Sequence, residues 1–481
     1  MSLDERTTLL RHAAPHPTGG PLPAILPAVS RLKDTIDTQY GLPEPDTSLG
    51  EQERTAFLLL VYLHLYRSLL TPIVSVQDIR MVWTSAIAST NKANETEARL
   101  LEIWTTYLDT QSPSLSEVQS LLWSEFPLEY NSTRCTKAVD CLHSEHVPPA
   151  FLVHPVVQAT MMATWKVGLR YRDGGERYHI WRRFDALTSP RAMHFIHLLG
   201  HLLFVGALSH YLLYPPPFIV FFDSPRYTSR EIFLVVMAAS SLFAPWTLHS
   251  LSYIQVFLAF ALTLPSEPLP GYLVFTFLHI ALMVHMVSLH LPYAPSVAYL
   301  LYPSTGVSLS SLLMQCVTRF LLPLIALFLP AMLFTSYLAS ASLADSPLYR
   351  LSVLNLVPMD TRTSFFLLFL LAVFALIFSI AATFSTADMS FATSAEPWDR
   401  YTPAVGRPAR KMFYRAVTRY TGHVFVPPFN VLLLIVIIPS FLHFLLGYRR
   451  SQVFKEMKVI MWRLSVGVLG AVVGGMWLWG L

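Results

Sequence analysis

No lysine or arginine occurs between Arg230 and Arg319, and apolar runs fill most of this stretch. A helix needs about 20 apolar residues to cross a bilayer core about 30 Å thick, and several of these runs approach that length. Of the 481 residues 53% are apolar and 13% charged, whereas a soluble domain has about 25% charged residues. So few charges cannot cover a globule of this size with a solvated surface. The sequence therefore predicts an all-α membrane protein that crosses the bilayer several times, without a nucleic-acid partner.

The apolar runs and the basic flanks together predict six spans. The predicted spans are Met193–Tyr214, Ile232–Leu248, Tyr253–Leu264, Gly271–Leu289, Leu312–Leu338 and Phe365–Phe384. Basic residues precede the first span, from Lys166 to Arg191, and follow the last, from Arg400 to Arg419. Lysines and arginines next to spans stay on the cytoplasmic side, so both flanks lie in the cytosol only if the number of crossings is even. Six spans satisfy this condition, and a seventh at Tyr293–Leu301 does not.

The segments outside the spans complete a five-part domain prediction. The parts are a disordered tail (1–50), a cytosolic helical domain (51–190), a six-span channel-like domain (191–385), a basic cytosolic linker (386–422), and an apolar hairpin with a terminal membrane helix (423–481). Val424–Leu446 has basic residues on both sides, which favours a hairpin broken at Pro439 over a straight crossing. Gly470 and Gly474 have the spacing that lets two membrane helices approach closely.

The tail contains a candidate sorting signal. Glu5, Leu9 and Leu10 in DERTTLL form an acidic dileucine pattern, which adaptors on the cytosolic face read to send membrane proteins to lysosomes or vacuoles. Such short address motifs are read by receptors and carry no structural information. The expected partner of the tail is thus a sorting adaptor.

Histidines are the conspicuous polar residues of the spans, and ionisable groups at membrane depth are candidate functional sites. They are His194, His197, His201 and His210 in the first span, His249 near the second, and His279, His285 and His290 in the fourth. His197 and His201 form an H-x-x-x-H pair, which places both rings on one helix face at metal-ligand spacing. A di-iron enzyme would also need H-x-x-H-H boxes, which are absent. The open alternatives are a haem between the first and fourth spans and neutral rings hydrogen-bonded between helices.

A second group of possible ligands precedes the spans. Cys135, Cys141, His143 and His146 lie within a dozen residues, but their spacing matches no common zinc module. We therefore expect no resident metal or cofactor and no enzymatic activity.

The loop between the fifth and sixth predicted spans has the place of a pore loop. Its candidate residues are Asp345, Asn355 and Asp360, because cation channels use acidic side chains and backbone carbonyls to attract and coordinate ions. The fourth span has no lysine or arginine, which excludes an arginine-based voltage sensor. Spacing of i, i+3 and i+4 in the sixth span predicts a pore-lining stripe. Its residues are Leu368, Phe369, Ala372, Ala375, Leu376, Ser379 and Thr383.

Four stretches, in this order, resemble the fungal vacuolar cation channels of the transient receptor potential type. They are RRFDALTSPRAMHFIHLLGHLLFVGAL (Arg182–Leu208), APSVAYLL (Ala294–Leu301), FFLLFLLAVFALIFSIAATFSTADMSF (Phe365–Phe391) and HVFVPPFNVLLLIVIIPSF (His423–Phe441). The resemblance implies a Ca2+-permeable, non-selective cation channel of the vacuolar membrane, with a cytosolic N-terminus. It also implies a homotetramer around the sixth spans that passes Ca2+ and monovalent cations.

The chain departs from that family at two places. The loop before the last pore helix reads LSVLNLVPMD instead of the glycine-containing filter, and no acidic cytosolic tail follows the pore. Two alternatives to a channel therefore stay open. One is a membrane redox enzyme with a haem or metal held by histidines, and the other is a non-conducting regulatory scaffold.

Overall fold

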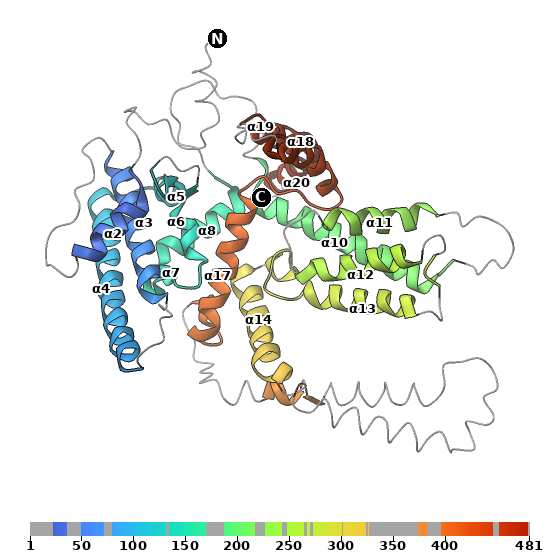
Figure 1. Ribbon diagram of the computed structural model, residues 1–481, viewed down its shortest axis with the longest axis horizontal. Helices are drawn as coiled ribbons and strands as arrows, with labels where there is room; N and C mark the ends of the chain where they lie inside the picture. Colours follow the sequence, from blue (N-terminus) through green and yellow to red (C-terminus); the bar gives the residue numbers. More distant parts are fainter. Residues whose placement is uncertain are drawn as a thin grey trace, which may run out of the picture. The chain divides into compact units, whose positions relative to one another are not determined.

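The protein is almost wholly helical in its computed structural model (Figure 1). The one sheet among the described residues pairs two short strands, β1 (Phe126–Pro127) and β2 (Cys135–Thr136). This confirms the all-α prediction. The residues that the structure describes are 23–35, 50–71, 79–130, 134–169, 187–216, 227–242, 248–263, 267–269, 273–300, 302–323, 326, 374–375, 377–381, 396–445 and 452–479.

The chain divides into two compact units. The first comprises Met1–Leu289, Tyr293–Pro295 and Lys411–Leu481, and the second comprises His290–Pro292 and Ser296–Arg410. Helix α17 (Pro403–Tyr420) begins in the second unit and ends in the first.

The N-terminal part of the first unit is a group of helices around α3. These helices are α2 (Ile25–Thr35), α3 (Glu51–Leu70), α4 (Ile79–Gln111), α5 (Leu115–Trp123), α6 (Ala138–Leu142), α7 (Pro149–Val153) and α8 (Pro155–Val167). Nine residues of α3 are buried, and the helix contacts α2, α4, α5 and α6. Gln119 on α5 donates hydrogen bonds to the Thr164 hydroxyl (2.8 Å) and the Gly168 carbonyl (3.0 Å), which fixes α5 to the end of α8. These contacts pack the helices that precede the first predicted span against one another, and the predicted domain boundaries stay predictions.

Helix α2 lies inside the segment predicted to be a disordered tail. Ile25, Val29 and Leu32 recur at i, i+4 and i+7, and all three are buried. This spacing puts them on one helix face, which packs on α3. The structure thus differs from the prediction at Ile25–Thr35, because the apolar face of α2 is covered by α3, a separate segment of the chain.

Four helices of the first unit form a closed bundle at the positions of the first four predicted spans (Figure 1). They are α10 (Pro190–Leu213), α11 (Ser229–Ser241), α12 (Leu248–Leu262) and α13 (Leu273–Ser288). Each of the neighbouring pairs α10/α11, α11/α12, α12/α13 and α10/α13 is in contact. One end of the interior is apolar and includes Phe204, Leu208, Met237, Val256 and Leu278. The other end carries the histidines described below.

Two of the described helical stretches are long and apolar enough to cross a membrane, namely Pro190–Leu213 and Glu456–Met476. Shorter apolar helices cover His249–Leu262, Leu273–Ser288 and Phe429–Ser440. The first predicted span therefore has the length of a crossing. Glu456–Met476 contains the start of the terminal helix that was predicted to begin near Val466.

The C-terminal helices belong to the first unit and pack beside α10. They are η5 (Phe429–Leu433), α18 (Leu434–Leu445), α19 (Gln452–Trp462), η6 (Arg463–Gly467) and α20 (Val468–Trp479). The predicted break at Pro439 is wrong, because α18 continues through this residue. A proline removes one helix hydrogen bond, and membrane helices tolerate this loss. The described hairpin is instead formed by α18 and α19, which contact each other.

Gly470 and Gly474 pack inside the chain. A Cβ at Gly474 would overlap the backbone oxygen of Leu187, and a Cβ at Gly470 would come within 2.9 Å of the Met193 sulfur. The two glycines therefore let α20 approach the start of α10, so their spacing has an explanation that needs no second copy of the chain.

The second unit holds the described pieces of the predicted pore hairpin. They are η1 (Val297–Tyr299), α14 (Pro303–Cys316), η2 (Val317–Leu321), the residues 374–375 and 377–381, and η4 (Pro397–Asp399). Helix α14 begins at Pro303, earlier than the predicted span at Leu312, and this proline occupies a first-turn position that lacks a helix hydrogen bond anyway. Most of the predicted loop and sixth span lies outside the described residues.

The packing of Gly474 predicts a position-specific loss of stability. Gly474→Ala puts a methyl group against backbone that cannot rotate away, so we expect a loss of about 1–3 kcal/mol, as for overpacked cores. Gly475→Ala is the matched control, because nothing lies within 4 Å of a Cβ there. Thermal unfolding of the detergent-solubilised chain should show a lower Tm for Gly474→Ala alone. Equal Tm values for the two variants would contradict the close packing of α20 on α10.

Candidate functional site: a buried histidine cluster

Helix α10 presents three histidines to the interior of the first unit. Pro190 opens the helix, and the Ser189 hydroxyl caps it by accepting a hydrogen bond from the Ala192 N–H. His194, His197 and His201 then follow at helical spacing and are 1%, 5% and 3% exposed. The rings of His197 and His201 lie 5.0 Å apart. The predicted placement of this H-x-x-x-H pair on one face is therefore confirmed.

Helices α12 and α13 each add one histidine to the same cluster. The ring centroid of His201 lies 5.0 Å from that of His249 on α12 and 5.0 Å from that of His285 on α13. His249 and His285 are themselves 5.9 Å apart and almost wholly buried. We call His197, His201, His249 and His285 the histidine cluster.

Direct hydrogen bonds connect the cluster to its neighbours. His201 Nδ1 lies 3.0 Å from His285 Nε2 and 3.1 Å from the Tyr253 hydroxyl. His197 Nδ1 lies 2.8 Å from the hydroxyl of Tyr420, the last residue of α17. Burial raises the pKa of the Tyr420 phenol, which keeps this hydroxyl neutral. The cluster is thus hydrogen-bonded both within the bundle and to α17.

Two serines are hydrogen-bond partners of the rings on α12 and α13. Ser252 donates its hydroxyl hydrogen to the His249 carbonyl (2.8 Å) and lies 2.6 Å from His285 Nδ1. Ser252 is therefore a hydrogen-bond partner of both the His249 carbonyl and the His285 ring. Ser288 repeats the pattern, because it donates to the His285 carbonyl (2.7 Å) and lies 2.7 Å from His249 Nδ1. In both rings, therefore, a serine hydroxyl is the partner of Nδ1.

The two Nε2 atoms have different surroundings. His285 Nε2 is hydrogen-bonded to His201 Nδ1 at 3.0 Å. His249 Nε2 is buried without a side-chain partner among the described residues, and the backbone of Tyr293 interacts with the same ring. Buried polar atoms without a partner are rare in folded proteins, and each one asks for an explanation.

The charged group that acts on the cluster is a cation. Arg419 on α17 is the cation that acts on His197, His201 and His249, and its guanidinium donates to the Ala294 carbonyl at 2.8 Å. No carboxylate hydrogen-bonds with these four rings in the part of the chain that the structure describes. His194 packs against Tyr420 next to the cluster. Two further span histidines of this unit lie apart: His210 pairs with Arg230, and His279 bonds to the Phe275 carbonyl of its own helix.

The geometry of the cluster favours hydrogen-bonded imidazoles over a metal centre. Among the described residues, no group of three or more histidines, cysteines and acids could hold a metal ion. His201 Nδ1 and His285 Nε2 are joined directly by a 3.0 Å hydrogen bond, which occupies two nitrogens that a shared metal would need as ligands.

The cysteines before the bundle are also poorly suited to zinc. Cys135 is exposed and Cys141 is buried, so they face different surroundings. Burial raises the pKa of the Cys141 thiol to about 12, and zinc binds the thiolate form. Burial also lowers the pKa of His143.

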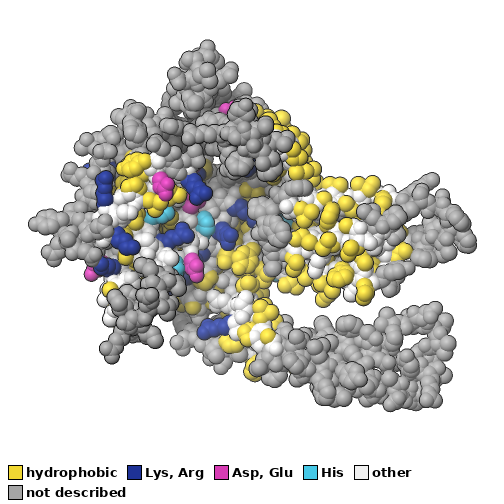
Figure 2. Space-filling model, viewed as in Figure 1, with side chains coloured by type: hydrophobic (Ala, Val, Ile, Leu, Met, Phe, Trp, Pro, Cys, Tyr) yellow, Lys and Arg dark blue, Asp and Glu magenta, His cyan; other side chains and the backbone are white. Residues whose placement is uncertain are grey.

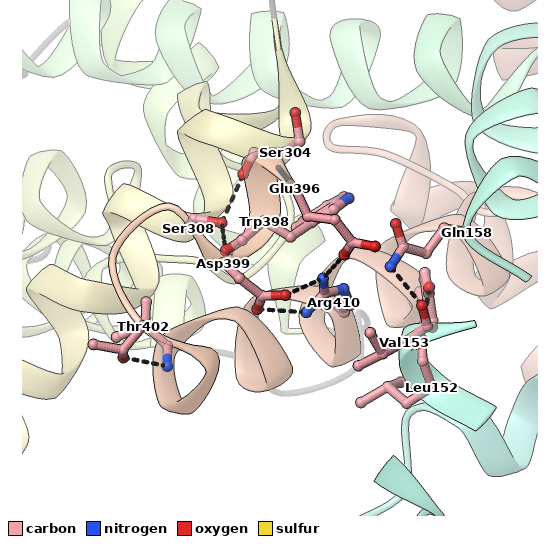
Figure 3. Close-up of polar contacts among 12 residues, drawn as sticks. Leu152, Val153, Gln158, Ser304, Ser308, Glu396, Trp398, Asp399, Thr402 and Arg410 are labelled. Carbon is pink, nitrogen blue, oxygen red and sulfur yellow. Dashed lines mark hydrogen bonds and ion pairs between the residues drawn. The ribbon is translucent and has the colours of Figure 1, made fainter. Parts of the chain in front are cut away.

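A second polar site lies in the second unit, where Arg410 holds the turn before α17 (Figure 3). The Arg410 side chain is 0% exposed; its Nη1 and Nη2 donate to the two Asp399 oxygens at 2.8 and 2.6 Å, and Nη2 also donates to Glu396 at 2.5 Å. The Trp398 carbonyl in the same turn accepts a 3.0 Å hydrogen bond from Ser308 on α14. Such two-pronged arginine–carboxylate pairs are strong and directional. They fix the turn at Pro397–Asp399 to α17, and Ser308 fixes the same turn to α14.

The predicted pore and sorting residues have little structural description. Ala375 and Ser379 are the described members of the pore stripe; Ser379 is buried and donates to the Cys316 carbonyl at 3.0 Å. The rest lie outside the described residues: Leu368, Phe369, Ala372, Leu376 and Thr383 of the stripe, Asp345, Asn355 and Asp360 of the loop, and Glu5, Leu9 and Leu10 of the tail. Their roles stay predictions.

Several functional contacts were not foreseen in the sequence. Ser252 and Tyr253 follow His249 by three and four residues, and Ser288 follows His285 by three. Residues at these distances share a helix face, so the partners on α12 and α13 could have been found from spacing. Tyr420 and Arg410 gave no such signal, because their partners lie on distant segments.

Comparison with models of known protein families finds none that matches the chain, and a search of curated proteins finds no significant match.

The Arg410 contacts predict a strong and selective loss of stability. Arg410→Met leaves Asp399 without its cation, and breaking a buried ion pair in this way costs about 3–5 kcal/mol. Arg407→Met is the control, because Arg407 is exposed on the same helix. We expect faster hydrogen exchange of residues 396–402 in Arg410→Met than in Arg407→Met. Equal exchange in the two variants would contradict the proposal that Arg410 stabilises the turn before α17.

Proposed function

We propose that this chain is an integral membrane protein and a Ca2+-permeable, non-selective cation channel, related to the fungal vacuolar channels of the transient receptor potential type. The observation that carries the membrane part is the distribution of side chains in the α10–α13 bundle. Polar side chains occupy one end of its interior, and apolar side chains cover its outer surface.

The contrast between the two sides of the bundle is large. His201, Ser252 and Ser288 in the interior are 3%, 0% and 1% exposed, whereas Leu203, Met283 and Val287 on the outer surface are 56%, 68% and 62% exposed. Figure 2 displays the visible face of the bundle as an almost continuous layer of hydrophobic side chains. Soluble monomers rarely expose apolar patches beyond a few hundred Å². In a bilayer this surface faces hydrocarbon, and the polar interior meets its hydrogen bonds within the bundle.

The order of elements supports the channel part. A helical domain precedes four bundled helices, which are followed by α14, the helical pieces at 374–381, and the basic helix α17. The resemblance in Ala294–Leu301 and Phe365–Phe391 assigns the pore to the segments after the bundle. In this proposal the six spans are those predicted from sequence, and four copies surround the pore-lining stripe.

We also propose a membrane for the channel and the ions that it conducts. The dileucine pattern at Glu5, Leu9 and Leu10 would direct it to the vacuole, and the basic flanks favour a cytosolic N-terminus. Ca2+ and monovalent cations would pass to the cytosol, with Asp345, Asn355 and Asp360 at the mouth. A haem or metal redox enzyme has less support, because the facing histidines bind each other directly.

Patch clamp on isolated vacuoles tests this function. Vacuoles from fungal cells in which this chain is the only candidate channel should show single-channel steps with K+ or Ca2+ as charge carrier. Ala375→Trp should abolish these steps because it fills the predicted pore. Ile377→Trp is the matched control, since Ile377 lies off the predicted stripe and is 56% exposed.

The outcomes separate the alternatives. Steps that vanish in Ala375→Trp and persist in Ile377→Trp support a pore lined by the sixth span. Silence from wild-type protein that is demonstrably present in the vacuolar membrane would contradict the channel and favour a regulatory scaffold. Steps that survive both substitutions would contradict the assignment of the pore.

A further inference from the structure

A cavity in the first unit lies where the end of α17 meets the start of α10. Its volume is about 290 Å³, and its walls come from α5, the turn before α6, the start of α10, the end of α17, and Trp462 of α19. A single water occupies about 30 Å³. The cavity therefore has room for a small molecule or for the polar end of a larger one.

The charged wall of the cavity is an ion pair. Among the described residues that line it, the lysine and acidic side chains are Lys137 and Glu125, whose Nζ and carboxylate oxygen lie 2.8 Å apart. The two side chains are 32% and 34% exposed. An ammonium has three hydrogens and a carboxylate accepts several hydrogen bonds, so each partner can also bind a ligand. Because the pair has no net charge, it favours a ligand with one positive and one negative group over an anion.

Two threonines add hydrogen-bond acceptors to the wall. Thr418 and Thr421 both line the cavity. The Thr418 hydroxyl donates to the Tyr414 and Arg415 carbonyls at 3.1 and 3.0 Å, and the Thr421 hydroxyl donates to the Thr418 carbonyl at 2.9 Å. A hydroxyl has one hydrogen, so these oxygens offer lone pairs to a ligand. A primary ammonium, with three N–H donors, matches these acceptors and the Glu125 carboxylate better than a quaternary ammonium does.

The cavity lies at the expected boundary between water and lipid. Thr188 and Pro190 line it, and Pro190 is the first residue of α10, whose length and composition suit a membrane crossing. Trp462 is 3% exposed, and its Nε1 donates to the Val424 carbonyl at 2.9 Å. Tryptophan is enriched at membrane–water interfaces. A ligand in the cavity is therefore at the level of phospholipid headgroups.

We propose that the cavity binds a phosphoethanolamine group, the headgroup of phosphatidylethanolamine. Glu125, Thr418 and Thr421 accept hydrogen bonds from its ammonium, and Lys137 donates to its phosphate. The lipid as the source of this group rests on the membrane part of the proposed function. Recognition of the group itself needs neither a bilayer nor conduction.

A bound headgroup would connect segments that are distant in the sequence. Glu125 and Lys137 belong to the N-terminal part of the unit, Thr188 precedes α10, and Thr418 is in the last turn of α17. Farther along α17, the Tyr414 hydroxyl already donates to the Leu152 carbonyl of the N-terminal helices at 3.1 Å. The ligand would add a second connection at the end of the helix. Because it binds the folded chain, it should also raise the Tm.

Native mass spectrometry of the full-length, delipidated chain in a phosphate-free, non-ionic detergent tests the proposal. Three lipids with the same acyl chains and an ethanolamine, choline or glycerol headgroup are added in turn. The apparent Kd should be about tenfold lower for phosphatidylethanolamine than for phosphatidylglycerol, which corresponds to about 1.4 kcal/mol. Phosphatidylcholine should lie between them, because it keeps the phosphate and lacks the N–H donors.

One substitution should reverse this preference. Glu125→Gln removes the carboxylate that accepts from the ammonium and leaves Lys137 as an unpaired cation, so phosphatidylglycerol should then bind more tightly than phosphatidylethanolamine. Partly exposed ion pairs contribute little to stability, so the variant should fold. Glu102→Gln is the matched control, because Glu102 pairs with Arg99 on α4 and does not line the cavity. It should retain the wild-type preference.

Two results would overturn the proposal. Equal affinity of the wild-type chain for phosphatidylethanolamine and phosphatidylglycerol would contradict recognition of the headgroup, and this comparison needs no variant. A preference for ethanolamine that is unchanged in Glu125→Gln would contradict the assignment to this cavity.

A soluble competitor separates the two sources of the ligand. Glycerophosphoethanolamine has the same headgroup without acyl chains and should displace the lipid only at much higher concentration. Displacement at the concentration of the lipid itself would overturn the lipid as the source and assign the cavity to a soluble phosphoethanolamine compound. None of these readouts depends on conduction, so silent vacuoles would contradict the channel and leave the binding site standing.

Discussion

Hydrogen bonds between side chains hold the interior of the α10–α13 bundle together at its polar end, and the outer surface explains why they are needed. The histidine cluster, two serines and two tyrosines satisfy one another inside. Leucines, methionines and other apolar side chains cover the outside. In water the exposed apolar side chains would contribute nothing to the stability of the bundle. In lipid, an internal hydrogen bond is the way for a polar side chain to be satisfied, so the same arrangement becomes stable.

Helix α17 connects this interior to the rest of the chain. Its first turns are fixed by Arg410 in the second unit, and its last residue bonds to His197 in the first. Phe413 and Tyr414 add contacts with Trp165 and the Leu152 carbonyl of the N-terminal helices. The part of α17 that follows Arg410 therefore contacts both the N-terminal helices and the bundle.

Local spacing in the sequence was enough to predict the helical fold, the first four apolar helices and the shared face of His197 and His201. It failed where the deciding partner is distant in the chain. Helix α2 is ordered because α3 covers its apolar face, and Gly474 is needed because Leu187 lies against it. Pro439 suggested a break, but α18 continues through it. The contacts of His249 with Ser288 and of His285 with Ser252 depend on how α12 and α13 face each other, which spacing within one helix does not show.

The central claim is that the bundle is surrounded by lipid. Spin labels at Met283 on the bundle and at Ser89, a partly exposed residue of α4, test it directly in reconstituted protein. The collision rates of each label with oxygen, which concentrates in hydrocarbon, and with a water-soluble nickel chelate would be compared. The label at Met283 should favour oxygen and the label at Ser89 should favour nickel. Equal access of nickel to both positions would contradict a membrane-embedded bundle.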